Sequence, residues 1–197
     1  MSTPRILIAG IGNIFLGDDA FGVEVVRRLA QRSLPDEVRV VDFGIRGFDL
    51  ACAVLENYEL VVLVDIAPRG AAPGTVYLIE PEMPTPAEIA ASGVAVEMHN
   101  LTPERVLRMA ASFGSIRARV LVVGCEPLQF QSENDADADT DGPDAMAFGL
   151  SPPVQAAIDR AISIIESLVT QTLGSSTIGD RSLAGIYLGR QPNESQI

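Results

Sequence analysis

The stretch RILIAGIGNIFLGDDAFG, residues 5–22, decides how the chain begins to fold. Residues 5–10 form a short, mostly apolar run, which is typical of a strand buried on both faces of a sheet. A glycine-rich turn follows, and from Ala20 to Arg32 apolar residues recur about once per helical turn. The stretch therefore predicts a strand, a tight turn and a helix, with two adjacent carboxylates, Asp18 and Asp19, inside the turn.

The rest of the chain continues this alternation of strand and helix patterns. Further strands are predicted at residues 37–44, 60–67 and 118–127, with a possible edge strand at 74–80. Helices are predicted at 48–55, 102–113 and 151–173, with Ser151 as the cap of the last one, and residues 82–99 look irregular. This order predicts an α/β fold in which helices cover both faces of a largely parallel sheet.

One domain is expected over residues 1–173. Residues 131–145 form an acidic, low-complexity insertion, and residues 174–197 are expected to be a mobile tail. The insertion is either a solvated loop without function or a segment that steers a basic partner surface toward the protein.

The net charge of the chain restricts the kinds of partner that it can bind. The 197 residues carry a net charge of -12, which argues against nucleic acid and anionic membranes and favours a basic or neutral protein partner. No apolar run approaches the roughly 20 residues of a membrane-spanning helix, and the N-terminus lacks a signal-peptide pattern. The two cysteines, Cys52 and Cys125, make no disulfide framework. We therefore expect a cytoplasmic protein.

The glycine turn permits a nucleotide-binding interpretation and a capping interpretation. Gly10 and Gly12 match the first two glycines of a dinucleotide-binding turn, and Asp42 ends the next strand, where a ribose-binding carboxylate would lie. Phe15 replaces the third glycine, however, and Asp18 and Asp19 would repel a pyrophosphate. Alternatively, one aspartate caps the following helix, which leaves the other unexplained.

A metal site is the third interpretation. Asp65 ends the strand at 60–67, and ligands of open α/β sheets gather at the carboxyl ends of strands. His99, the only histidine, precedes the helix at 102–113. With Asp19, these residues offer two carboxylates and one imidazole to a divalent ion and leave positions open. A lone histidine before a helix is more often an ordinary surface or capping residue.

Six segments of the chain resemble those of a known family. They are GIGNIFLGDDAFGVEVV, VVDFGIRGFDL, LVVLVDIAPRGAAPGTV, MHNLTPERVL, VVGCEP and GLSPPVQAAIDRAI. Their order is that of the [NiFe]-hydrogenase maturation endopeptidases, and the resemblance covers residues 5–170. It implies a three-layer α/β/α sandwich around a five-stranded, mostly parallel, twisted sheet. It also implies an endopeptidase that removes the C-terminal peptide of the hydrogenase large-subunit precursor after nickel insertion.

The resemblance also implies the site residues. Asp19, where many relatives have Glu, Asp65 and His99 would bind nickel supplied by the precursor, and zinc or cadmium could occupy the same site. The loop at 42–47 matches a family loop with two glycines after the aspartate, but Phe43 replaces the first of them.

The route of peptide cleavage stays open at this point. Either the metal polarises the carbonyl or activates a water, with Asp42 or an unused carboxylate oxygen as base, or Cys125 and His99 form a nucleophilic pair. Two other functions are a non-proteolytic assembly chaperone for nickel or hydrogenase and a nucleotide-binding module.

Overall fold

The five strands form a single sheet in the order β2-β1-β3-β5-β4. The computed structural model describes residues 4–91, 101–128 and 149–175. The parallel strands are β1 (Ile6–Ile11), β2 (Val38–Gly44), β3 (Leu60–Ile66) and β5 (Arg119–Cys125), and β4 (Val76–Ile79) runs antiparallel to β5 at one edge. The predicted α/β class and the predicted edge strand are therefore confirmed.

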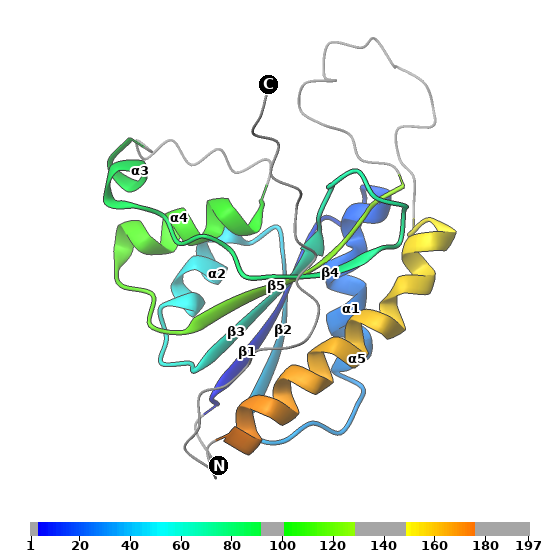
Figure 1. The fold of residues 1–197 in the computed structure, drawn as a ribbon, viewed down its shortest axis with the longest axis horizontal. Helices are drawn as coiled ribbons and strands as arrows, with labels where there is room; N and C mark the ends of the chain where they lie inside the picture. Colours follow the sequence, from blue (N-terminus) through cyan, green and yellow to red (C-terminus); the bar gives the residue numbers. More distant parts are fainter. Residues whose placement is uncertain (1–3, 92–100, 129–148, 176–197) are drawn as a thin grey trace, which may run out of the picture.

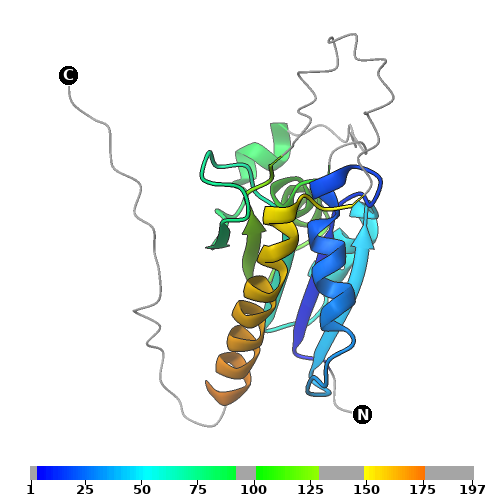
Figure 2. The ribbon, with the colours of Figure 1, turned by 90° about the vertical axis from the view of Figure 1, so that its right-hand side faces the viewer.

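Helices cover both faces of this sheet, so the fold has three layers (Figure 1). Helices α1 (Phe21–Leu29) and α5 (Pro152–Ser175) lie side by side on one face, as Figure 2 shows. Helices α2 (Gly47–Val54) and α4 (Pro103–Phe113) cover the other, and α3 (Pro86–Ala91) contacts α4. A 3₁₀ turn, η1 (Gly17–Ala20), leads into α1.

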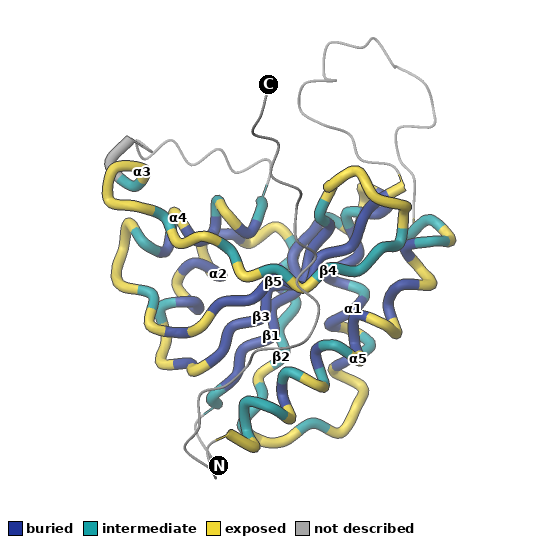
Figure 3. Tube along the Cα trace, viewed as in Figure 1, coloured by how far each residue is buried: buried dark blue, intermediate teal, exposed yellow. Residues whose placement is uncertain are grey.

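The sheet separates two hydrophobic cores. Along β1, Ile6 and Ile8 pack toward α1 and α5, whereas Leu7 and Ala9 pack toward α2 and α4. Successive side chains of a strand point to opposite faces, so a run that is apolar at every position fills both cores at once. Strands β1 and β3 are accordingly buried along their whole length (Figure 3).

Some predicted boundaries need correction. The segment expected to be irregular at 82–99 contains α3, whose start is stabilised by a capping box. There, Thr85 N–H donates to Glu88 Oε2 at 2.7 Å, and Glu88 N–H donates to Thr85 Oγ1 at 3.3 Å. The helix predicted at 20–32 is the shorter α1, which η1 precedes, and α5 continues through Ser175, two residues past the predicted end of that helix at residue 173.

Other expectations fall partly or wholly outside the described residues. The acidic insertion at 131–145, His99 and the tail beyond residue 175 are in this group. Among the helices that the structure describes, none combines the length and the apolar character needed to cross a membrane.

Two glycines allow η1 and α1 to lie directly against the sheet. Gly12 has a φ of +129°, and a Cβ there would overlap the carbonyl oxygen of Asp19. A Cβ on Gly22 would overlap the carbonyl oxygens of Ile11 and Val64, at the ends of β1 and β3. Gly22 therefore provides the close helix–strand packing that the third glycine provides in a dinucleotide-binding turn.

We predict that Gly22→Ala destabilises the protein by at least about 3 kcal/mol, because backbone atoms of two central strands would have to move. Gly174→Ala is the matched control: this helical glycine has open space around it, and alanine there should be neutral or stabilising by up to about 1 kcal/mol. Urea unfolding measures both free energies. Equal stability of the two variants would show that α1 does not depend on this close approach.

Candidate active site

Asp19 and Asp65 lie near each other at the carboxyl edge of the sheet. Asp19 belongs to η1, the first element after β1, and Asp65 is the next-to-last residue of β3, the strand beside β1. The charge of Asp19 contributes to the raised pKa of Asp65, which requires the two groups to be close. The structure therefore brings together two of the three predicted ligands, and His99 lies outside the described residues.

Each of these carboxylates has one oxygen fixed by a backbone N–H. Asn13 N–H donates to Asp19 Oδ2 at 2.6 Å, and Ile66 N–H donates to Asp65 Oδ1 at 2.8 Å. In the described part of the chain, neither carboxylate forms an ion pair with an arginine. The remaining oxygen of each carboxylate therefore has a fixed orientation, and no arginine offsets its negative charge in the described part of the chain.

Burial raises the pKa of both groups. For Asp19, burial outweighs the opposing effect of the hydrogen bond from Asn13. Asp65 is only 4% exposed, and burial raises its pKa well above the usual range, with further contributions from the charges of Asp19 and Glu104. Glu104, in the first turn of α4, is a third acidic group at this edge that the sequence did not single out.

Two desolvated carboxylates without a compensating cation are stabilised by a proton or by a metal ion. Carboxylate oxygens suit divalent ions, with an imidazole favouring transition metals. Within residues 4–91, 101–128 and 149–175, no cluster of three or more His, Cys, Asp or Glu side chains has the geometry to hold a metal. The described residues thus include two of the three predicted ligands, Asp19 and Asp65, while His99 lies outside them.

Asp18 does not cap the following helix, contrary to one expectation from the sequence. Its carboxylate is 2% exposed and accepts hydrogen bonds from Leu128 N–H at 2.8 Å, Ser151 N–H at 2.7 Å and Ser151 Oγ–H at 3.0 Å. Asp18 therefore joins η1 to the end of β5 and the start of α5. Ser151 still stands at the start of α5, because its carbonyl accepts from Gln155 N–H.

The structure contradicts a nucleophilic role for Cys125. The thiol is fully buried in the core between the sheet and α5. Burial, followed by the charges of Asp18 and Glu126, raises its pKa to about 12. A thiol in this environment stays protonated and is a poor nucleophile.

Asp42 is also poorly placed to act as a base at this site. It lies on β2, and β1 separates it from Asp65, so the two backbones are about 10 Å apart. Its carboxylate instead contacts Arg27 Nε at 3.3 Å. In the same loop Phe43 is buried in the core under α2, and Gly44, with a φ of +54°, makes the turn.

Comparisons with known proteins agree with this architecture. The family model of hydrogenase maturation proteases matches residues 23–168. A putative hydrogenase maturation protease of Methanocaldococcus jannaschii is 34% identical over 84% of this chain and 96% of its own length. The hydrogenase 2 maturation protease of Escherichia coli is 30% identical over 80% of this chain and 86% of its own.

Solved structures show the same likeness. The hydrogenase maturating endopeptidase HybD of Escherichia coli superimposes with a TM-score of 0.61 and 27% identity, covering 85% of this chain and 93% of that one. A hydrogenase 2 maturation peptidase from a Thaumarchaeota archaeon gives a TM-score of 0.55 and 30% identity, over 86% and 98% of the two chains. The predicted three-layer α/β/α fold is therefore confirmed.

We predict that Asp65→Asn makes the protein more stable at neutral pH. The raised pKa of Asp65 means that the folded state holds this proton to higher pH than the unfolded state. Wild-type stability should therefore fall as pH rises from about 4 through the folded pKa. The amide avoids this loss, and the variant's advantage should reach on the order of 1–3 kcal/mol at pH 7 and shrink toward pH 4.

Urea unfolding at both pH values measures this difference. Asp36→Asn, at an exposed site remote from the carboxyl edge, is the control, and its free energy of unfolding should stay close to that of wild type. If Asp65→Asn lowers the free energy of unfolding equally at pH 4 and pH 7, the ionised Asp65 carboxylate does not destabilise the wild-type protein at neutral pH.

Proposed function

Since the chain belongs to the hydrogenase maturation protease family, we propose that it removes a C-terminal peptide from a [NiFe]-hydrogenase large-subunit precursor. We further propose that it recognises nickel in that precursor through Asp19, Asp65 and His99. The observation that carries this proposal is the pair of buried, neighbouring carboxylates that no arginine neutralises in the described structure. A divalent cation brought by the substrate would supply the missing positive charge.

Recognition of this kind follows from how the two carboxylates are held. Their backbone hydrogen bonds orient them before any ion arrives, so little reorganisation is needed on binding. Ligands must be deprotonated to bind a metal, and a nearby cation lowers the pKa of a carboxyl group. The precursor's nickel and the ionised form of the pair therefore stabilise each other. Nickel is substrate here, although zinc or cadmium can take the same donors.

The same carboxylates can serve in peptide hydrolysis. The nickel of the precursor polarises groups near the bond to be cut. With Cys125 protonated and Asp42 paired to Arg27, the unused oxygen of Asp65 or Asp19 is the best-placed proton acceptor in the described site. A carboxylate oxygen that does not hold the ion can accept a proton from the attacking water and return it to the leaving amine.

The alternative functions have less support. A nucleotide-binding role conflicts with the turn after β1, where the backbone of Asp19 fills the space beside Gly12. The family model that matches residues 23–168 is that of hydrogenase maturation proteases, which favours a protease over an assembly chaperone without protease activity.

We predict that wild-type protein shortens nickel-loaded precursor and leaves nickel-free precursor intact, because recognition requires the ion. Asp65→Ala and His99→Ala should each abolish shortening, whereas Asp36→Asn should not change it. Mass spectrometry of the precursor before and after incubation gives the result directly. Efficient shortening of nickel-free precursor would overturn nickel recognition while leaving the protease activity in place.

A further inference from the structure

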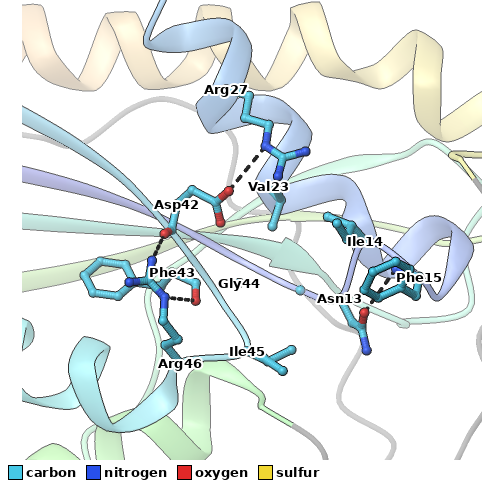
Figure 4. Close-up of a pocket in the computed structure, with 11 residues that line it drawn as sticks. Asn13, Ile14, Phe15, Val23, Arg27, Asp42, Phe43, Gly44, Ile45 and Arg46 are labelled. Carbon is cyan, nitrogen blue, oxygen red and sulfur yellow. Dashed lines mark hydrogen bonds and ion pairs between the residues drawn. The ribbon is translucent and has the colours of Figure 1, made fainter.

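A cleft of about 370 Å³ lies at the carboxyl end of β2 (Figure 4). Its walls come from α1 and from the loops after β1 and β2. Three large apolar side chains on these loops are exposed: Ile14 by 39%, Phe15 by 51% and Ile45 by 63%. Apolar side chains that gather in the open around one cleft indicate an interaction site.

The charged groups of the cleft already have partners, and Arg46 lies 3.9 Å from the carboxylate of Asp49, outside the cleft. Arg27 contacts both Asp42 and Glu24 at 3.3 Å. Arg46 donates to the backbone carbonyls of Asp42 and Phe43, and its guanidinium lies over the Phe43 ring. A charged ligand group would lose its hydration here without finding a free partner among these residues, so the cleft favours an uncharged apolar group.

Arg46 also limits how a peptide can bind. Strand β2 is at the edge of the sheet, and an edge strand can normally pair with an added peptide strand. Here the carbonyls of Asp42 and Phe43 accept hydrogen bonds from Arg46. The cleft is therefore better suited to receive a side chain than to extend the sheet.

Two residues that line the cleft also contact Asp19 of the candidate active site. Asn13 lines the cleft, and its N–H is the donor that fixes Asp19 Oδ2 at 2.6 Å. Gly12 also lines it, in contact distance of the Asp19 backbone. An extended peptide advances about 3.4 Å per residue, so a chain with its scissile bond at Asp19 and Asp65 reaches the cleft within a few residues.

We propose that this cleft is the subsite that binds one bulky apolar side chain of the precursor, a few residues from the bond that is cut. This rests on the proposed function, because it takes the precursor as the occupant. The volume is at the low end of ligand pockets, roughly 300–1,000 Å³, and suits one or two side chains. Recognition then has two parts: an ion at the carboxylates and an apolar residue in the cleft.

Kinetics of precursor shortening test this subsite. Ile45→Ser and Ile14→Ser should each raise KM about tenfold or more and change kcat less than twofold, since they weaken binding of a group remote from the reacting atoms. Leu78→Ser is the matched control, because Leu78 is 37% exposed but lies on β4, at the opposite edge of the sheet. Its KM should equal that of wild type, and unchanged thermal midpoints show that the variants fold.

Photo-crosslinking identifies the occupant independently of cleavage. With p-benzoyl-phenylalanine in place of Ile45, irradiation in the presence of nickel-loaded precursor should attach the protein to a precursor residue near the cleavage site. The same group in place of Leu78 should not. Crosslinks to the protein's own residues 176–197, to a second copy of the chain, or to a distant part of the precursor would overturn the proposal.

The two proposals fail in different ways. If wild-type protein leaves the nickel-loaded precursor intact, the proposed function is wrong. If wild-type protein shortens it and the Ile45 and Ile14 variants keep the wild-type KM, only the subsite is wrong.

Discussion

The contact between the start of α1 and the ends of β1 and β3 constrains everything at the carboxyl edge. It exists because Gly12 and Gly22 have no side chains, so backbone meets backbone. The chain leaving β1 must therefore turn back within a few residues, and it does so through the loop at 12–16 and then η1. With about three residues per turn, neighbouring side chains of a 3₁₀ turn point roughly 120° apart. Two adjacent aspartates on this turn consequently face different surroundings.

This geometry divides two chemically identical residues into two roles. The Asp18 carboxylate is fully engaged by Leu128 and Ser151, and a buried charge with three donors is well compensated. Asp19 instead lies near Asp65, where burial and mutual repulsion oppose ionisation. The fold thus tolerates electrostatic repulsion between Asp19 and Asp65. The neighbouring Asp18 connects η1 to the end of β5 and the start of α5. Repulsion between buried carboxylates is typical of functional sites.

The sequence predicts the strands and the carboxylate pair, but not the role of Asp18, helix α3 or the cleft. The strands were predictable because a run that is apolar at every position suits a two-sided core. The gathering of Asp19 and Asp65 at one edge followed from the rule that parallel strands end together. The role of Asp18 could not be read locally, since its partners are 110 and 133 residues away. Helix α3 was not predicted, although Thr85 and Glu88 have the spacing of a capping box and form one in the structure. The cleft depends on which loop side chains stay exposed, which only the packed structure decides.

Asn13 connects the two halves of the candidate site. Its backbone N–H holds Asp19 Oδ2, and its side-chain Oδ1 accepts from Phe15 N–H at 3.0 Å, which shapes the turn that carries Ile14 and Phe15. The carboxylate site over β1 and β3 and the cleft over β1 and β2 therefore share one short loop. A ligand that displaces this loop changes the orientation of Asp19, and an ion held by Asp19 restrains the loop. Because linkage between two sites is reciprocal, filling the cleft and binding the ion must influence each other to the extent that this loop moves.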